Sequence, residues 1–242
     1  MEVRETKCKS VLHEMSFGGS REYTANFYRG CSHGCIYCYA QSLVHQDRPW
    51  GSFVDVKVNA PEVIETETRR MRPCPVFLSS ATDPYQPVEA KYRLTRRCLE
   101  VLVRREFEVT ILTRSPLVLR DLDLLRAGRV SVGMSISSVS TRYFEPGVPP
   151  LERRLSTLSK LSSEGIETWV SMAPIFPSLM LDDVENLAAR LKEVGVTRVS
   201  AGVARWAGYE VSRRFFEEKT GMSADAVSED TEGVLAGVKA SL

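Results

Sequence analysis

The sequence contains no apolar run long enough to cross a membrane. A membrane-spanning helix needs about 20 consecutive apolar residues, and no stretch of the 242 residues provides them. The first residues are charged and lack the apolar core of a secretory signal. We therefore expect a soluble, cytoplasmic protein without a membrane partner, in which thiols stay reduced.

An excess of charge of either sign is also missing. The 32 Lys and Arg residues are balanced by 31 Asp and Glu residues, which leaves a net charge of +1. This balance argues against a protein that coats nucleic acid or anchors to a membrane through a basic segment. A local basic groove stays possible, so nucleic acid is a possible partner that the net charge does not indicate.

The chain has no internal repeat, low-complexity tract or linker, and we predict one folded domain. Short β-rich runs alternate with longer helical patterns, which predicts parallel strands joined by right-handed crossovers. The predicted strands are residues 23–28, 76–80, 108–112, 130–136, 167–172 and 198–202. Six such units are too few for a closed eight-stranded barrel. We therefore predict an α/β fold, namely a partial, open (βα)6 barrel of parallel strands, with a doubly wound open sheet as the second choice.

The predicted core covers residues 23–221, between an extended lead-in of residues 1–22 and a weakly ordered tail of residues 222–242. Asn59 is placed to cap a helix that starts near Pro61. In either fold the functional residues should follow the carboxyl ends of the strands, where the connecting loops gather.

The six cysteines are few and unevenly spread, and Cys31, Cys35 and Cys38 share the loop after the first predicted strand. A structural zinc site needs four ligands, and no second Cys-x-x-Cys pair is present. A thioredoxin-like pair of Cys35 and Cys38 would leave Cys31 unexplained. A four-iron cluster normally takes four cysteines, so three would leave one iron open to another ligand. We interpret the open coordination position as typical of a catalytic cluster. A structural zinc site or an electron-transfer module is the alternative.

This C-x3-C-x2-C loop, with an aromatic residue before its last cysteine, resembles the signature of the radical S-adenosylmethionine (SAM) enzymes. The resemblance implies that Cys31, Cys35 and Cys38 bind a [4Fe-4S] cluster and that Tyr37 lies beside the adenine of SAM. In that superfamily an external one-electron donor, such as flavodoxin or ferredoxin, reduces the cluster. SAM is then cleaved to methionine and a 5′-deoxyadenosyl radical, which takes hydrogen from a substrate.

A second stretch, residues 77–87, follows the second predicted strand and resembles the spore photoproduct lyase-like branch, also called DNA repair photolyase-like. The resemblance to this branch implies that residues at matching positions contact SAM. The implied SAM-binding residues are Ser80, Thr82 and Asp83 at the amino group, Arg114 at the carboxylate, and Ser135 or Ser138 at the ribose or carboxylate. Thr113 and Ser115 are equally explained as caps of the following helix.

The chain departs from a true spore photoproduct lyase at the position of its hydrogen-donating cysteine. Here Ala81 stands in that region, and little sequence follows the sixth strand. We therefore expect a radical SAM enzyme with another, unidentified substrate, for which nucleic acid and protein are the two candidate classes. Tyr37, Tyr39 and Tyr85 are the candidates for a catalytic role, as radical relays or as walls of the pocket. Residues 144–147, Phe-Glu-Pro-Gly, are interpreted as a turn that fixes the loop.

Overall fold

A seven-stranded sheet forms the centre of the computed structural model, which describes residues 1–17, 20–44, 47–137 and 143–229. The described strands follow the order β2-β3-β6-β7-β8-β9-β10. Neighbours from β3 to β10 are parallel, and β2 is added antiparallel to β3 at one edge. The strands are β2 (Leu12–Phe17), β3 (Ser20–Ala25), β6 (Pro75–Leu78), β7 (Glu108–Thr113), β8 (Arg129–Ser135), β9 (Glu167–Ile175) and β10 (Val199–Val203).

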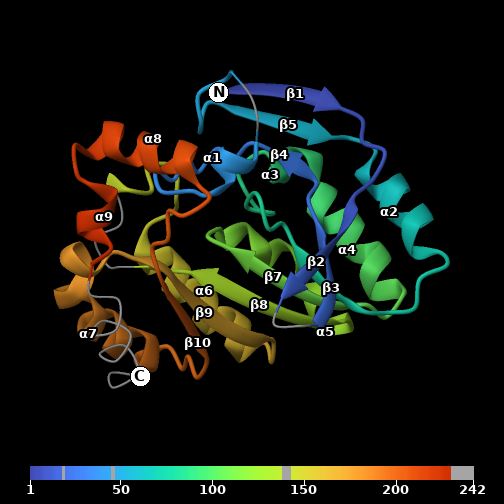
Figure 1. Cartoon of the computed structure of the whole chain (residues 1–242). Helices are drawn as coiled ribbons and strands as arrows, with labels where there is room; N and C mark the ends of the chain where they lie inside the picture. The colour runs from blue at the N-terminus through green and yellow to red at the C-terminus, as the bar shows by residue number, and fades with distance from the viewer. Residues whose placement is uncertain (18–19, 45–46, 138–142, 230–242) are drawn as a thin grey trace.

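The order of the strands decides between the two predicted folds. Each new parallel strand is added on the same side of the previous one, so the colours in Figure 1 follow one another across the sheet from blue β3 to orange β10. A doubly wound sheet would reverse direction at a switch point. Six parallel strands in sequential order, with β2 and β10 unpaired to each other among the described residues, confirm the open (βα)6 arrangement.

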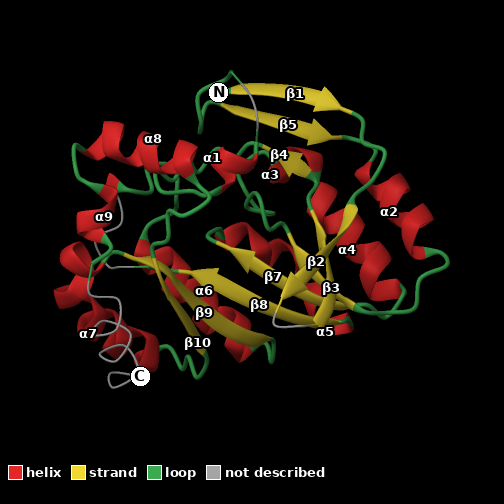
Figure 2. Ribbon diagram, in the orientation of Figure 1, coloured by secondary structure: helices red, strands yellow, loops and turns green. Residues whose placement is uncertain are grey.

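Helices connect the parallel strands, as Figure 2 shows. They are α1 (Ala40–Leu43), α2 (Ala60–Thr68), α3 (Glu89–Tyr92), α4 (Leu94–Arg104), the 3-10 helix η1 (Pro116–Asp121), α5 (Leu122–Ala127), α6 (Leu151–Ser163), α7 (Pro177–Glu193), α8 (Glu210–Thr220) and α9 (Ala224–Val227). None of these described helices combines the length and apolar character that a bilayer crossing demands.

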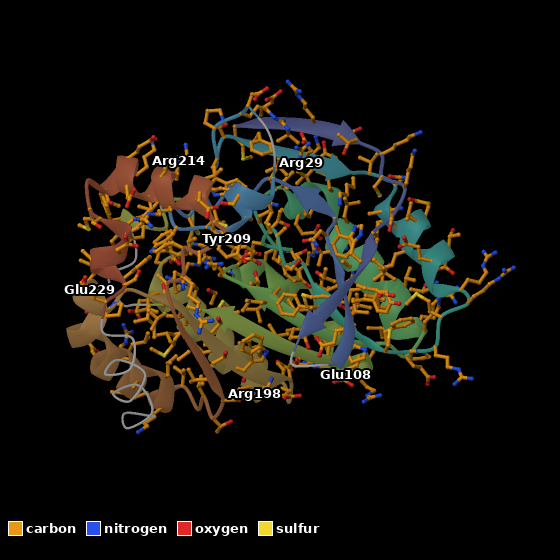
Figure 3. The ribbon with its side chains drawn as sticks, viewed as in Figure 1. Arg29, Glu108, Arg198, Tyr209, Arg214 and Glu229 are labelled. Carbon is orange, nitrogen blue, oxygen red and sulfur yellow. The ribbon has the colours of Figure 1, made fainter. Side chains whose placement is uncertain are left out.

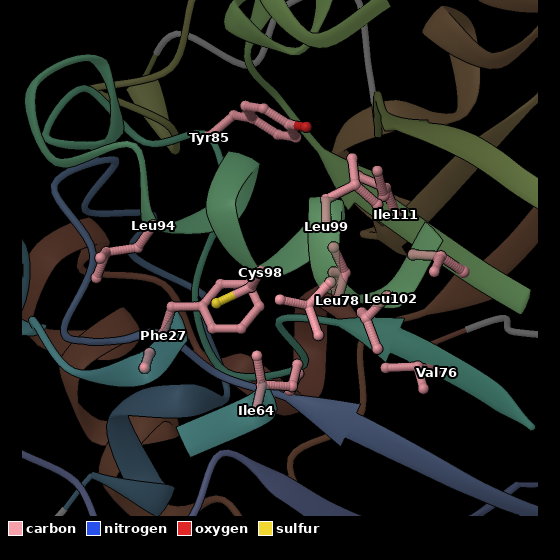
Figure 4. Packing of buried hydrophobic residues seen from close by; sticks show 14 of the residues in the cluster. Phe27, Ile64, Val76, Leu78, Tyr85, Leu94, Cys98, Leu99, Leu102 and Ile111 are labelled. Carbon is pink, nitrogen blue, oxygen red and sulfur yellow. The ribbon is translucent and has the colours of Figure 1, made fainter. Parts of the chain in front are cut away.

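The amphipathic pattern of α4 explains how a helix is fixed to the sheet. Leu94, Cys98, Leu99 and Leu102 recur at helical spacing and are buried, and Figure 4 shows them packed with residues of β6 and β7. Burying a side chain of this size contributes about 1.5–3 kcal/mol. Cys98, fully buried in this contact, is thus a small core residue.

The N-terminal residues, expected as an extended lead-in, form paired strands. Strand β1 (Glu2–Thr6) runs parallel to β5 (Phe53–Lys57), and β4 (Tyr28–Arg29) pairs antiparallel with β5. The predicted strand 23–28 therefore starts earlier and ends earlier than expected, because the chain leaves the large sheet after Ala25. This small sheet lies at the top of Figure 1.

Asn59 occupies the N-cap position of α2, as predicted, but its side chain does not cap the helix. Its side chain makes no capping hydrogen bond to α2. Instead, Asn59 Oδ1 accepts a hydrogen bond from Cys8 N (2.8 Å) and Asn59 Nδ2 donates one to Cys8 O (2.9 Å). A side-chain amide can match a neighbouring backbone in this way, and here it ties the N-terminal segment to the start of α2.

Residues labelled in Figure 3 mark the two ends of the parallel strands. Glu108 begins β7 and Arg198 directly precedes β10, and both lie towards the bottom of Figure 3, at the amino ends. Tyr209, which follows β10, lies on the other side of the sheet, towards α8 and α1. The loops at this carboxyl edge carry the candidate site.

Candidate functional site

The loop of residues 31–38 is shaped by glycines and by tight turns. Gly30 has φ +80°, and a Cβ there would lie 2.5 Å from Phe53 O of β5. Only glycine fits such a close backbone approach. Within the loop, Gly34 N donates to Cys31 O (3.3 Å) and Cys38 N donates to Cys35 O (3.2 Å). These turns bring the three cysteines to one side of the loop.

Cys31, Cys35 and Cys38 all line one pocket of about 340 Å³ at the carboxyl ends of the strands. Cys31 and Cys35 are buried and Cys38 is partly exposed. Burial raises the pKa of each thiol to about 12, and each also interacts electrostatically with another cysteine of the loop. Such thiols need a cationic centre to become thiolates, which are the form that binds metals.

The cysteine loop is clamped by a second loop, residues 144–147. Ile36 N donates to Phe144 O, and Gly147 N donates to His33 O, both at 3.0 Å. A Cβ on Gly147 would lie 2.4 Å from Ser32 O, so no larger residue fits without moving the cysteine loop. The predicted turn is present, since Val148 N donates to Glu145 O.

Helix α8 covers the loop from the opposite direction and contacts α1 (Figure 1). Ser212, fully buried on α8, donates its hydroxyl to Cys38 O (2.8 Å), and its backbone N donates to Ser42 Oγ (3.1 Å). The last cysteine is thereby held by an element that lies more than 170 residues later in the chain.

Asp83 joins three loops of the site. Its Oδ1 accepts hydrogen bonds from Thr113 Oγ1 (2.7 Å) and Tyr85 N (2.8 Å). Its Oδ2 accepts one from Arg114 N (2.7 Å) and lies 3.3 Å from His33 Nδ1. Burial alone would raise the pKa of Asp83, but His33 and these donors outweigh it and lower the pKa below its ordinary value.

Glu145 is the other buried carboxylate, with 2% of its surface exposed. It accepts hydrogen bonds from the Tyr37 hydroxyl and, at 3.3 Å, from Arg114 Nε, both on Oε1. Its Oε2 accepts one from Arg154 (3.2 Å), a buried arginine that also donates to Ser135 O (2.9 Å). Burial, followed by the charge of Glu145, raises the pKa of Tyr37 well above its usual range.

Most of the residues predicted for the site are brought together. The predicted residues that line the pocket are Cys31, Cys35, Cys38, Tyr37, Tyr39, Ser80, Thr82, Asp83, Arg114 and Ser135. Tyr85 does not line it and instead lies in the main hydrophobic core (Figure 4). Ser138 falls outside the described residues.

Of the two residues expected to cap the helix after β7, Ser115 does so, whereas Thr113, the last residue of β7, makes other contacts. Ser115 Oγ accepts a hydrogen bond from Leu117 N (3.2 Å) at the start of η1. Thr113 Oγ1 accepts one from Ser115 N (3.0 Å) and donates to Asp83. Both residues therefore shape the loop that carries Arg114.

The sequence interpretation missed the groups that surround these residues. Trp206 and Tyr209 line the pocket from the segment after β10, where no motif marks them. Glu145 and Arg154 were also missed. The Phe-Glu-Pro-Gly pattern gave a turn signal only, and Arg154 belongs to a doublet typical of an exposed helix face.

The donor set does not suit a single metal ion. Among the residues that the structure describes, no three His, Cys, Asp or Glu side chains converge closely enough to hold one ion. Zinc needs its ligands to meet around one point, whereas each thiolate of a [4Fe-4S] cluster binds a different iron. Three thiols around one pocket therefore fit a cluster and do not favour the zinc alternative.

Comparison with known proteins agrees with this geometry. A family model described as the radical SAM superfamily matches residues 25–191. An uncharacterized protein of Methanocaldococcus jannaschii is 33% identical over 198 residues, which are 79% of this chain and 74% of that protein. A protein of Pseudomonas phage M6 named radical SAM Nα-GlyT isomerase is 29% identical, and the match covers 84% of this chain and 45% of that protein.

Among solved structures, spore photoproduct lyase complexed with dinucleoside spore photoproduct superposes with a TM-score of 0.74. The superposition covers 99% of this chain and 78% of that one, at 17% sequence identity. At this identity the likeness shows a shared fold, including the open parallel sheet.

Proposed function

The chain belongs to the radical SAM superfamily, and from this premise we propose that it is an enzyme that generates a 5′-deoxyadenosyl radical to abstract hydrogen from a substrate. The observation that carries the proposal is the meeting of Cys31, Cys35 and Cys38 in one pocket at the carboxyl edge of six parallel strands. When bound, the [4Fe-4S] cluster and SAM supply the radical, and an external one-electron donor such as flavodoxin or ferredoxin reduces the cluster.

Cys31, Cys35 and Cys38 hold the cluster, and the polar residues around them orient SAM. Thr82 is the strongest candidate for the SAM amino group, because its buried hydroxyl has no hydrogen-bond partner among the described residues. A hydroxyl oxygen is a suitable acceptor for an ammonium group. Ser80 shares this role, although its hydroxyl already accepts a hydrogen bond from Thr24 Oγ1 (3.0 Å).

Arg114 faces the same pocket and takes the SAM carboxylate, because a guanidinium binds carboxylates in a fixed geometry. Ser135, at the end of β8, serves the ribose or carboxylate, and Tyr37 lies beside the adenine. Asp83 has both oxygens occupied by protein donors. We therefore assign Asp83 to holding the loops in place.

Tyr39 is the candidate for a radical relay. It lines the pocket, is 41% exposed, donates its hydroxyl to Ser80 O, and its ring centroid lies 5.5 Å from that of Tyr209.

The only cysteines among the described pocket residues are the three of the loop. Cys74 lies at the start of β6, at the amino end of the strand. A cysteine donor of the lyase type is therefore not part of this proposal.

The two substrate classes expected from the sequence, nucleic acid and protein, differ in how their binding responds to salt. A nucleic-acid substrate predicts binding that weakens steeply as salt rises, because phosphate contacts release counterions. Binding of a single-stranded oligonucleotide that does not change between low and high salt would remove this class.

The test is anaerobic reconstitution with iron and sulfide, followed by dithionite and SAM. We expect a cluster with about four iron and four sulfide per chain and release of 5′-deoxyadenosine, both lost in Cys31→Ala. A fully loaded protein that releases no 5′-deoxyadenosine would overturn the proposal. Stoichiometric zinc without sulfide in protein purified without oxygen would instead favour the metal-binding module.

A further inference from the structure

The Glu145 carboxylate lies where three parts of the site meet. The flanking residues Phe144 and Gly147 are hydrogen-bonded to the cysteine loop at 3.0 Å, so the position of Glu145 is set relative to the cysteines. Its two oxygens are then shared between groups from three other segments. A buried carboxylate is retained only where such partners compensate its lost hydration.

Oxygen Oε1 fixes two pocket residues at once. The Tyr37 hydroxyl and Arg114 Nε both donate to it, and Arg114 Nη2 lies 3.4 Å from the Tyr37 hydroxyl. The three groups form a closed triangle. The Nε edge of Arg114 is thus directed at Glu145, which leaves terminal guanidinium N–H groups for a ligand in the pocket.

Oxygen Oε2 connects this triangle to the sheet. Arg154, 1% exposed on α6, donates to Oε2 (3.2 Å) and to Ser135 O at the end of β8 (2.9 Å). Ser135 itself lines the pocket. The contacts of one carboxylate therefore extend from the cysteine loop to the carboxyl end of β8.

We infer that Glu145 is a positioning residue that orients Arg114 and Tyr37 together for SAM binding. The inference rests on the proposed function and deepens it. Without the carboxylate, the two side chains lose their common anchor, and the long Arg114 side chain gains rotamers that point away from SAM. The loss falls on SAM affinity, because Glu145 is not a cluster ligand and the cysteine loop keeps its backbone contacts.

The charge of Glu145 also acts on the cluster ligands. The backbone hydrogen bonds of Phe144 and Gly147 to the cysteine loop hold this carboxylate beside the residues that would bind the cluster. A buried negative charge disfavours an added electron on a neighbouring cluster. Removing this charge should therefore raise the reduction potential of the cluster.

The experiment compares wild type, Glu145→Gln and Glu145→Ala with the control Glu152→Gln. Glu152 belongs to α6 and is 72% exposed, so the control removes a carboxylate outside the pocket. After anaerobic reconstitution, iron and sulfide are counted, SAM affinity is measured by equilibrium dialysis with labelled SAM, and the midpoint potential is measured by EPR-monitored titration.

We expect Glu145→Gln to keep its cluster, to bind SAM about tenfold or more weakly, as loss of a charge-assisted hydrogen bond predicts, and to show a raised potential. The control should match wild type in all three measurements. SAM affinity within twofold of wild type and an unchanged potential in loaded Glu145→Gln would overturn the inference. If Glu145→Ala fails to hold the cluster, the measurements on Glu145→Gln alone decide whether the inference holds.

A purely structural role would lower stability and iron content while the loaded fraction bound SAM normally, and this result also counts against the inference. The proposed function fails separately, if loaded wild-type protein neither binds SAM nor releases 5′-deoxyadenosine.

Discussion

Replacing Gly147 by alanine tests whether the loop of residues 144–147 sets the position of the cysteine loop. A Cβ at residue 147 would lie 2.4 Å from Ser32 O and 2.9 Å from His33 Cα. Both atoms are backbone, so no side-chain rotation relieves the contact. Reaching even a tight separation of 3.0 Å requires a movement of about 0.6 Å.

A movement of this size matters because the clamp and the ligands share one short segment. The hydrogen bond from Gly147 N to His33 O is 3.0 Å long, and the cysteines flank His33. Metal–ligand distances tolerate only about 0.2 Å of error. We therefore expect Gly147→Ala to cost about 1–3 kcal/mol of stability, as overpacking does, and to lower the iron and sulfide retained after reconstitution.

The matched control is Gly195→Ala. Gly195 has φ +78° and no atom within 4 Å of an added Cβ, so alanine there strains the backbone by about 1 kcal/mol without touching the site. Thermal unfolding of both variants and their iron content per chain are the measurements. If Gly147→Ala binds as much iron and sulfide as Gly195→Ala, the clamp does not position the cluster ligands.

Three further predictions concern single residues. Cys38→Ala should abolish cluster binding, whereas Cys98→Ala, in the core, should cost about 1 kcal/mol and keep the iron; equal iron loss in both would contradict the assignment. Asp83→Asn should cost about 2–3 kcal/mol, since charge-assisted hydrogen bonds are lost. Because folding lowers the pKa of Asp83, the ionised carboxylate stabilises the wild-type fold above about pH 4, and this stabilisation is lost as the pH falls through the lowered pKa. In urea unfolding, the free energy of unfolding of the variant should therefore depend less on pH in this acid range. Asn59→Ala should lower the free energy of unfolding in urea by about 1–2 kcal/mol, because it removes two hydrogen bonds to the Cys8 backbone. Unchanged stability would show that this contact contributes nothing.

The parallel strands could be predicted because their signal is local. In Val130–Ile136, valine, methionine and isoleucine alternate with serine and glycine, a period of two residues that is typical of a strand, and β8 occupies residues 129–135. The small sheet was missed because β1 is largely exposed, so its residues show no apolar pattern. Its pairing with β5 depends on a contact between segments about 50 residues apart, which no local pattern reveals.

In the site, too, features with a local sequence signal could be predicted, whereas contacts between distant segments could not. The grouping of Cys31, Cys35 and Cys38 is predictable since their spacing lies within one loop, and glycines beside them permit the turns. Glu145 was missed because its partners Tyr37 and Arg154 come from distant segments. In the sequence, a glutamate before Pro-Gly indicates a turn. Only the folded structure shows that this glutamate is buried and accepts hydrogen bonds from residues of the site.

Polar residues of one loop can have the same sequence signal and still differ in what they can bind. Thr82 and Asp83 are neighbours, both follow β6, and both were assigned to the SAM amino group from their position. In the structure, the acceptors of Asp83 are used by Thr113, Tyr85, Arg114 and His33, whereas the hydroxyl of Thr82 has no partner among the described residues. A carboxylate whose lone pairs are taken by the protein gains little from a further ammonium, and a buried unpaired hydroxyl gains a full hydrogen bond. Which of the two residues contacts the ligand is therefore decided by the number of acceptors still free, and that number depends on tertiary contacts rather than on residue type.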